Sequence, residues 1–528
     1  MPDSPSDRGV DEPYDLAVIG AGCAGLAGAV TASEQGLSVA LLDTAGRIGG
    51  QFYRHPAPAV GAVRPEALHH DWSAFAGLRC RLEASDVVHL AGHHVWTVER
   101  NDAPEAADGT YPTSVDAQEA GEADARWTVH AVTGADGDGE RPVRVRARAV
   151  LLATGAYERQ LPFPGWTLPG VVGAAGAQAM LRLVLPGRRV VVAGSGPLLL
   201  AVAASLAAAG ASVPAVVEAS GYLGYARRPR VLAANPQKPA EALLHGAALL
   251  RHGVRLRVRS AVTEVHGTDR VEAVTVSRLD RDWRPVRGTG RRIACDALAV
   301  GHGLVPQTEL ATSLGCATRR TPDGTYALAL DALQQTSVPG LWAAGETGGI
   351  GGAQLARVEG ELAAIAVAAR VRGRPEPARD GRVRELQRRR ERMRAFAGVM
   401  AAVHAPGPGW TAWLDDATEV CRCEEVPAGA VREAVDAYGA RDARTVKLLT
   451  RAGMGWCQGR VCGAAVACLA AGEGTSTVPP SPDRRPLAGP VPLGVLGSVD
   501  PGPPEAPPAV PAEQPDTARP DDAARPGE

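Results

Sequence analysis

The chain has 528 residues, of which 45% are apolar and only 4% aromatic, and its formal net charge is −2. This length predicts more than one globular domain. The balanced charge excludes the strongly basic class of nucleic-acid-binding proteins, and nothing in it favours an anionic membrane. Nine cysteines in so long a chain do not indicate the disulfide framework of a small secreted protein.

The N-terminal residues are polar and acidic, so no signal peptide is predicted. The uncharged stretch 190–217 could be mistaken for a membrane span. Glycine and proline interrupt it, however, and it is better divided into strand, turn, helix and strand. The sequence therefore predicts no transmembrane segment.

A dinucleotide-binding pattern begins at Asp15. The apolar run 16–19 predicts a buried strand, and Gly20-Ala21-Gly22-Cys23-Ala24-Gly25 follows it directly. In such a motif the first glycine permits the turn, the second lets backbone approach a pyrophosphate, and the third lets the helix pack on the sheet. Asp43 ends the next strand, at about the spacing of an acid that binds a ribose hydroxyl. These residues predict a dinucleotide site at Gly20, Gly22, Gly25 and Asp43.

A second pattern of the same kind begins at Arg189 and departs from the motif at one position. The predicted strand 189–193 is followed by Gly194-Ser195-Gly196-Pro197-Leu198-Leu199, and Glu218 ends the next strand. Leu199 stands where the third glycine is expected, which would hold the helix away from the strand and narrow the site. Gly194, Gly196 and Glu218 are candidates for a second site, and the pattern leaves open whether it binds NAD(P), another adenine nucleotide or nothing.

Three further segments place small residues where a backbone could meet a cofactor. They are Gly50 with Gln51, Thr154 with Gly155 at the end of a strand, and Gly345 with Glu346 before a glycine-rich helix start. Disulfide reductases with two dinucleotide folds keep a redox cysteine pair near the first of these. No cysteine lies between Cys23 and Cys80, so that chemistry is not expected here.

Four cysteines form two pairs near the C-terminus, Cys421 with Cys423 and Cys457 with Cys462. Four thiolates can hold a [2Fe–2S] cluster or a zinc ion. Structural zinc sites favour Cys-x-x-Cys pairs, which neither pair matches, so a cluster is favoured. Several glycines surround the second pair and would let backbone amides approach the sulfurs. Residues 371–395 are rich in arginine and predict a solvated helix or linker, with a partner-docking face as the alternative.

Together these segments resemble a known family. The matching stretches are GAGCAGLAGA, ATGAYERQLPFPGWTLPGV, AGSGPLLLA, GHGLVPQTEL, AAGETGGIGGAQLARVEGELAA, CRCEEV and GMGWCQGRVC. From about residue 14 to 470 the chain resembles the FAD/NAD(P)-binding α (or A) subunits of bacterial dye-linked amine dehydrogenases. That group includes the A subunit of opine oxidase, the B subunit of hydrogen cyanide synthase and the α subunits of proline and hydroxyproline dehydrogenases. The last two stretches resemble the bacterioferritin-associated-ferredoxin [2Fe–2S] domain.

The resemblance implies an α/β fold with two Rossmann-like dinucleotide-binding domains and a small, mostly α-helical [2Fe–2S] domain. From about Gly472 onward proline, glycine, alanine, serine and aspartate dominate, which predicts a disordered tail. The expected parts are an FAD-binding domain (14–160, returning at 299–372), an inserted second dinucleotide-binding domain (161–298), an Arg-rich helical linker (373–415), the [2Fe–2S] domain (416–472) and a Pro-rich tail (473–528).

The resemblance also implies particular site residues. The expected FAD contacts are Gly20, Gly22, Gly25, Asp43, Gly50, Gln51, Thr154, Gly155, Gly345 and Glu346. The expected cluster ligands are Cys421, Cys423, Cys457 and Cys462. Related flavoproteins commonly have aspartate where this chain has Glu346, so the longer glutamate side chain would have to make the cofactor contact here.

In several members of this family a separate flavoprotein subunit, similar to D-amino-acid or glycine oxidases, oxidises the amine. No catalytic base stands out in this chain. We therefore expect a cytoplasmic or membrane-peripheral subunit that passes electrons from oxidation of an amine or imino acid of the opine, proline or glycine type. The electrons would pass through FAD and a [2Fe–2S] cluster to an acceptor. The expected partners are the oxidase-like subunit and, as a further candidate, a small [2Fe–2S] subunit.

Two alternatives remain open. One is an NAD(P)H-dependent reductase, in which hydride enters at the site of Gly194, Gly196 and Glu218. The other is a nucleotide-bound electron-transfer scaffold that is not itself a catalyst.

Overall fold

The computed structural model describes residues 13–54, 71–101, 127–134, 139–180, 188–374, 380–472 and 487–498. The described residues up to Pro490 form one compact unit, and those from Val491 to Ser498, which include the short helix α14 (Leu493–Gly497), belong to another. Most of the predicted disordered tail lies outside the described residues. In the described part of the chain, no helix has both the length and the apolar character needed to cross a bilayer.

The first dinucleotide-binding domain is built on a seven-stranded sheet with the order β3-β2-β1-β6-β5-β4 and with β19 beside β6. Its strands are β1 (Tyr14–Ile19), β2 (Val39–Asp43), β3 (Val88–Ala91), β4 (His94–Arg100), β5 (Trp127–Thr133), β6 (Arg141–Leu152) and β19 (Leu341–Ala343). β1 pairs in parallel with β2 and β6, while β4, β5 and β6 are antiparallel. The inner parts of the central strands, residues 16–19 of β1 and 149–152 of β6, are apolar and buried because both of their faces are covered.

Helices α1 (Cys23–Glu34), α2 (Trp72–Glu83) and α9 (Ala353–Val371) belong to this domain. α1 and α9 lie in direct backbone contact, since a side chain at Gly360 would come within 2.1 Å of the carbonyl oxygen of Ala24. Similarly, a Cβ at Gly25 would lie 1.7 Å from the carbonyl oxygen of Gly20. The third glycine of the motif is therefore required for the packing of helix against loop, as the sequence predicts.

The second dinucleotide-binding domain has a five-stranded parallel sheet with the order β11-β10-β9-β15-β8. Its strands are β8 (Val171–Gly173), β9 (Val190–Gly194), β10 (Ala215–Glu218), β11 (Arg255–Val258) and β15 (Ala297–Gly301), and its helices are α4 (Ala174–Ala179), α5 (Leu198–Ala208), α6 (Pro229–Ala234) and α7 (Gln237–Arg251). The uncharged stretch 190–217 is thus strand, helix and strand, as predicted.

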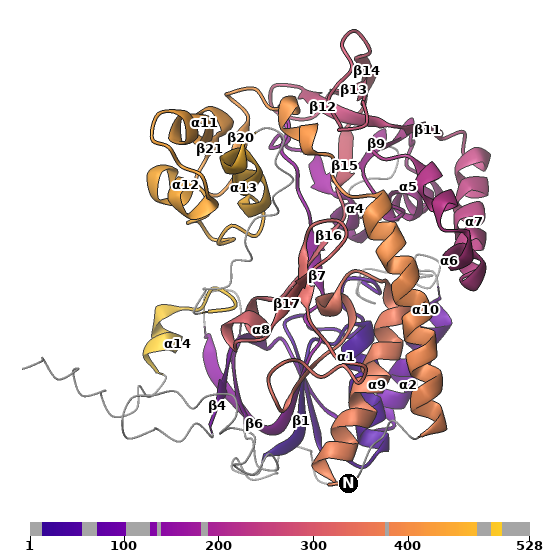
Figure 1. Ribbon diagram of the computed structural model, residues 1–528, viewed down its shortest axis with the longest axis vertical. Helices are drawn as coiled ribbons and strands as arrows, with labels where there is room; N and C mark the ends of the chain where they lie inside the picture. The colour runs from indigo at the N-terminus through magenta and orange to yellow at the C-terminus, as the bar shows by residue number, and fades with distance from the viewer. Residues whose placement is uncertain are drawn as a thin grey trace, which may run out of the picture. The chain divides into compact units, whose positions relative to one another are not determined.

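Smaller elements join and extend the two sheets. A ribbon of β7 (Ala156–Glu158) and β16 (Leu304–Pro306) carries the chain between the domains in both directions (Figure 1). β12 (Ser260–His266), β13 (Ala273–Arg278) and β14 (Arg291–Ala294) form a three-stranded sheet. The remaining short elements are η5 (Tyr222–Arg227), α8 (Glu309–Ser313), β17 (Thr318–Arg320), β18 (Tyr326–Leu328), η6 (Gly345–Gly348) and η8 (Pro408–Trp413).

The Arg-rich segment forms α10 (Gly381–Val403), which lies beside α9 (Figure 1). Asp380 caps it by accepting a hydrogen bond from the Arg382 amide. The expectation of a solvated helix is wrong for Arg390 and Arg394, whose side chains are only 18% and 17% exposed. Both reach Glu359 on α9, so this helix is part of the flavoprotein domain's packing.

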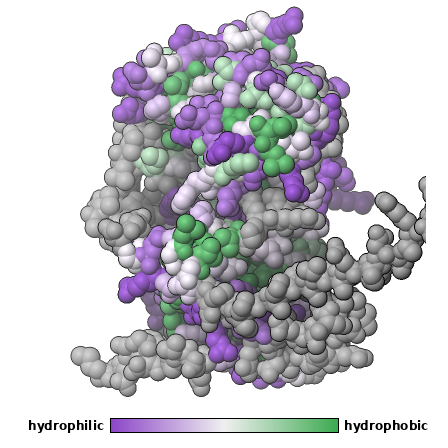
Figure 2. Space-filling model, turned by 90° about the vertical axis from the view of Figure 1, so that its left-hand side faces the viewer, coloured by the Kyte–Doolittle hydropathy of each residue, from purple (hydrophilic) through white to green (hydrophobic). Residues whose placement is uncertain are grey.

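The C-terminal domain contains β20 (Glu419–Cys421), β21 (Val426–Pro427), α11 (Ala428–Asp436), α12 (Ala443–Thr450) and α13 (Gly463–Ala471). Its apolar side chains, such as Val431 and Val466, share one hydrophobic core with β9, β15 and the three-stranded sheet. Trp166 also donates a hydrogen bond to the carbonyl oxygen of Glu419. The domain is therefore packed on the second dinucleotide-binding domain. Figure 2 shows the face of the molecule that carries it.

His302 is enclosed in this shared region, near the stacked rings of Trp283 and Trp413. Burial and, to a lesser degree, the nearby Arg159 charge lower the pKa of His302 from 6.5 to about 3. The folded protein thus holds a neutral ring, whereas the unfolded chain binds a proton below pH 6.5. Stability therefore falls as the pH falls through this window.

We expect His302→Phe to reduce the acid sensitivity of the fold. Between pH 6.5 and pH 5 the wild-type ring should cost about 2 kcal/mol of stability, and the phenylalanine variant should not show this loss. Urea unfolding at pH 7 and pH 5 measures the difference. The matched control is the exposed His252→Phe. An unchanged pH dependence in His302→Phe would contradict the assignment.

Candidate functional site

One large cavity, of about 1960 Å³, extends along both dinucleotide-binding domains. It is larger than an ordinary small-molecule site of roughly 300–1,000 Å³. Most of the predicted cofactor residues line it, namely Gly20, Gly22, Asp43, Gly50, Gln51, Thr154, Gly155, Gly345 and Glu346. Gly25 lies beneath the loop and acts through packing. Gly194, Gly196 and Glu218 do not line the cavity, although their neighbours Pro197 and Leu198 do.

The first glycine loop is arranged to receive an anion and a ribose. α1 begins at Cys23 with no capping side chain and no acidic residue in its first turn, so its amides remain for a pyrophosphate. Asp43 accepts hydrogen bonds from the amides of Ala21 at 2.5 Å and Ala45 at 2.7 Å. The acid is therefore fixed at the edge of the loop, where a ribose hydroxyl could reach it.

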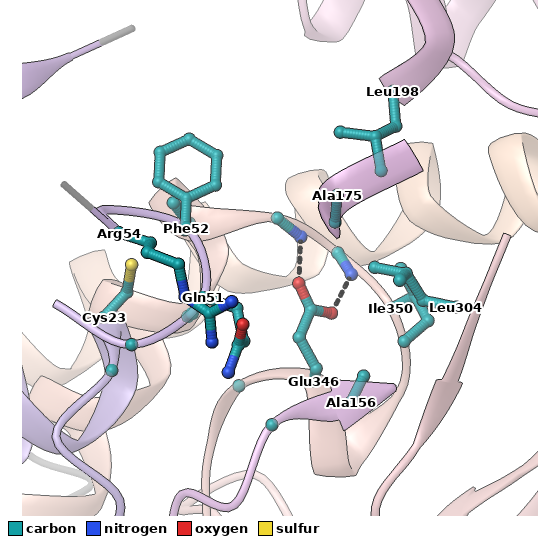
Figure 3. Close-up of a pocket in the computed structure, with 18 of the residues that line it drawn as sticks. Cys23, Gln51, Phe52, Arg54, Ala156, Ala175, Leu198, Leu304, Glu346 and Ile350 are labelled. Carbon is teal, nitrogen blue, oxygen red and sulfur yellow. Dashed lines mark hydrogen bonds between the residues drawn. The ribbon is translucent and has the colours of Figure 1, made fainter. Parts of the chain in front are cut away.

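Glu346 lies on the cavity wall between Gln51 and Ile350 (Figure 3). Its two carboxylate oxygens accept hydrogen bonds from the amides of Gly351 at 2.7 Å and Gly352 at 2.9 Å. Burial raises the pKa of Glu346, and the two amides partly oppose this. The extra methylene relative to aspartate is thus taken up by a local turn, which holds the carboxylate at the start of α9.

A buried ion pair that was not predicted from the sequence lies behind this loop. Glu359 is fully buried on α9, and Arg394 binds both of its oxygens at 2.7 and 2.6 Å. Glu359 also accepts a hydrogen bond from the amide of Gly345 at 3.1 Å. Arg394 donates in turn to the carbonyl oxygens of Gly345 and Gly349. The signal in the sequence was the position of Glu359, four residues after Leu355 and three before Leu362, on the apolar and buried face of α9.

Glu218 is also fully buried, beneath the carboxyl end of α10. Its oxygens accept hydrogen bonds from the amides of Gly196 at 3.0 Å and Ser220 at 2.9 Å. His404 Nδ1 lies 3.4 Å from Glu218 Oε1, and His404 also contacts Ser195 of the glycine loop. The chain itself therefore covers the acid that would hold a nicotinamide dinucleotide's ribose. Leu199 is buried in the core of the domain.

The four C-terminal cysteines come together as two pairs, Cys423 against Cys457 and Cys421 against Cys462. Cys421 and Cys462 are buried, Cys423 is exposed and Cys457 is half-buried. Among the described residues, no three His, Cys, Asp or Glu side chains converge as a single metal ion would need. Two pairs of thiols suit a two-iron cluster, in which each iron takes two protein ligands.

Backbone amides surround these sulfurs, as the glycine content predicts. The Gly453 amide donates to Cys421 Sγ at 3.4 Å, and amides from Gly459 to Val461 donate to Cys457. Such donors stabilise thiolate charge and tune a cluster's potential. Arg460, which lies between Cys457 and Cys462 in the sequence, forms a largely buried ion pair with Glu309 of α8 at 3.1 Å. Leu310, the next residue of α8, lines the large cavity.

Gly455 permits the close packing of the two cysteine segments. A Cβ at this position would lie 2.3 Å from Cys423 Cβ. We expect Gly455→Ala to displace the Cys423 turn and to lower the iron content of the purified protein severalfold, as measured by iron and sulfide analysis. Gly463→Ala is the matched control, because a Cβ there meets nothing within 4 Å. Equal iron contents in the two variants would show that the close contact is unimportant.

Residues 14–367 match the family model of the pyridine nucleotide-disulphide oxidoreductases. The chain belongs to this family. Residues 419–471 match the BFD-like [2Fe-2S] binding domain. The fold predicted from the sequence is thereby confirmed. This member of the pyridine nucleotide-disulphide oxidoreductases is a flavoprotein oxidoreductase with an FAD-binding domain and a [2Fe–2S] domain.

The family resemblance inferred from the sequence is also confirmed. The A subunit of opine oxidase from Agrobacterium tumefaciens (strain Ach5) is 34% identical over 482 residues, which are 90% of this chain and 90% of that protein. The HcnB subunit of hydrogen cyanide synthase from Pseudomonas protegens is 32% identical over 448 residues, 84% of this chain and 89% of that protein. L-proline dehydrogenase from P. horikoshii shares the fold, with a TM-score of 0.62 over 92% of this chain and 79% of its own, at 20% identity.

Proposed function

We propose that this chain is the electron-relaying subunit of an amine or imino-acid dehydrogenase. In this proposal the FAD contacts are the cavity-lining residues around Gly20, Asp43 and Glu346, and the cluster ligands are Cys421, Cys423, Cys457 and Cys462. Bound FAD supplies a group that accepts a hydride or electron pair and releases single electrons to a one-electron cluster. The chain's own residues bind and orient the two cofactors and keep them in one polypeptide.

The observation that carries the proposal is the burial of Glu218 beneath His404. In a dinucleotide-binding fold the acid at this position usually binds the ribose, so the covered acid favours an electron donor other than NAD(P)H. The described cavity residues also present no cysteine pair for disulfide chemistry; Cys23 is the cysteine among them. Two relatives that match over most of the chain are named as subunits, which supports a hetero-oligomer.

The amine substrate is proposed to be oxidised on a partner flavoprotein similar to D-amino-acid or glycine oxidases. Of the two relatives, one is named for opines and the other for hydrogen cyanide synthesis. A small [2Fe–2S] subunit is a further candidate partner. The substrate class proposed for the assembly is therefore a small compound with a C–H bond next to an amine nitrogen.

An anaerobic titration of the purified chain with NADH and then NADPH tests the proposal. We expect flavin and cluster absorbance to remain oxidised. Addition of the amine after co-expression with the oxidase-like subunit should then bleach both. Bleaching by a stoichiometric amount of NADH would overturn the relay proposal, and a chain that no amine reduces in the complex would instead be a scaffold.

An NAD(P)H-dependent reductase is the second candidate. The observation in its favour is that one cavity reaches both Gly22 of the first loop and Leu198 after the second. A nicotinamide nucleotide bound along α5 could thus approach a flavin without using Glu218. The same titration separates the two candidates.

A further inference from the structure

One face of α12 combines positive charge with exposed apolar surface. Arg444, Lys447 and Leu448 are spaced i, i+3 and i+4 and are exposed, so they share one side of the helix, and the exposed Arg451 follows at its C-terminal end. Val446 points the other way and is fully buried. Leu448 is 69% exposed, which is unusual for a large aliphatic side chain on a small domain.

The same surface continues toward the cysteines. Met454 and Trp456 follow α12, and Trp456 is 81% exposed immediately before Cys457. Figure 2 shows hydrophobic side chains bordered by hydrophilic ones on the upper part of the face that carries this domain. Exposed tryptophan and leucine are costly to leave in water and mark contact surfaces, in which tryptophan and arginine often dominate the binding energy.

Two contacts place this surface at the exposed edge of the proposed cluster. Arg451 Nε lies 3.0 Å from Glu424 Oε2, which ties the end of α12 to the turn after Cys423. Gly455 packs on Cys423 itself. The outer pair, exposed Cys423 and half-buried Cys457, therefore borders the α12 surface, while Cys421 and Cys462 face the core.

The charges on this surface are unbalanced. Lys447 forms no salt bridge with any of the described residues. Asp442 is engaged in capping α12, where it accepts from the amides of Arg444 and Thr445. Glu424 is occupied by Arg451, and Glu425 is the exposed acid that remains on the cysteine turn. An acidic partner would thus find complementary charge around an apolar centre.

We propose that the α12 surface, made of Arg444, Lys447, Leu448 and Trp456, is the docking site of an acidic electron-transfer protein. The inference rests on the proposed function, because it takes the four cysteines to hold the cluster. One electron leaves the reduced cluster and reduces the partner's one-electron centre, with no bond or proton transferred. Small, salt-sensitive interfaces of this kind suit transient redox encounters.

The probe is oxidised plastocyanin, an acidic protein with a one-electron copper centre. The chain is reduced with dithionite and mixed with it at low salt, and cluster reoxidation is followed by stopped flow. Binding to plastocyanin is measured separately by surface plasmon resonance. We expect Arg444→Glu/Lys447→Glu to lower the association rate roughly tenfold or more, and added salt to lower the wild-type rate. Trp456→Ala should weaken binding without changing the salt dependence.

The matched control is Arg251→Glu/Arg255→Glu, which reverses two exposed arginines beside exposed Leu250 and Leu256 on the second dinucleotide-binding domain. This variant should react as the wild type does, and reoxidation by a neutral quinone should be equal in all variants. Equal plastocyanin rates and affinities across the variants would overturn the proposal. Self-association of the wild type that Trp456→Ala abolishes would also overturn it, in favour of a second copy of this chain.

The two proposals fail in distinguishable ways. A chain that purifies without iron and sulfide overturns the cluster assignment before any mixing experiment. A chain with an intact cluster that binds plastocyanin no better than the charge-reversed variant overturns only the docking surface.

Discussion

Cys421→Ser is expected to abolish the iron–sulfur cluster while leaving FAD bound. Cys421 is fully buried, accepts a hydrogen bond from the Gly453 amide and lies against Cys462. A serine oxygen is a poor replacement for the soft thiolate that iron–sulfur clusters require. No described residue between 416 and 472 lines the large cavity, so flavin binding should survive. Iron, sulfide and FAD contents per chain measure the result.

Cys468→Ser is the control for this substitution. Cys468 lies on α13 in the same domain, and its thiol interacts with Trp410 rather than with the other cysteines. The variant should keep a full complement of iron. Retention of iron in Cys421→Ser would contradict the proposed ligand set, and equal loss in both variants would mean that general destabilisation of the domain causes it.

Arg394→Met should destabilise the flavoprotein domain by about 3 kcal/mol and weaken FAD retention. The substitution leaves Glu359 with only the longer contact to Arg390, at 3.3 Å, and the amide of Gly345. Removing one partner of a buried ion pair typically costs about 3–5 kcal/mol, because a charge then stays buried without adequate compensation. The carbonyl oxygens of Gly345 and Gly349 lose donors as well. Urea unfolding of the FAD-free protein and the FAD content after dialysis measure the two effects.

Arg388→Met on the same helix is the matched control. The Arg388 side chain is 73% exposed and pairs with Glu385 at the surface, where ion pairs contribute little. It should leave both stability and FAD content near the wild-type values. If Arg394→Met behaved in the same way, the Glu359 pair would not hold the flavin loop.

The local sequence was sufficient to predict those parts of the site that depend on residues close together in the chain. The glycines of the first loop, the acid at Asp43 and the small residues at Thr154 and Gly345 occur at strand ends, and the strands of a parallel sheet end at one edge. Their convergence on one cavity could therefore be predicted without knowing the packing. The spacing of the four late cysteines likewise favoured an iron–sulfur cluster, and the resemblance of the segments around them identified the C-terminal domain.

The remaining features depend on contacts between residues far apart in the chain. Glu218 matches a nucleotide-binding pattern, yet His404 covers it from a helix that is remote in sequence. Arg394 looked like one of many solvated arginines, yet it is buried because Glu359 meets it across the α9–α10 contact. The C-terminal domain shares a core with the second sheet because apolar side chains of both pack against each other and leave water together. Periodicity shows that a face will be buried, but the partner that buries it is set by how the domains pack.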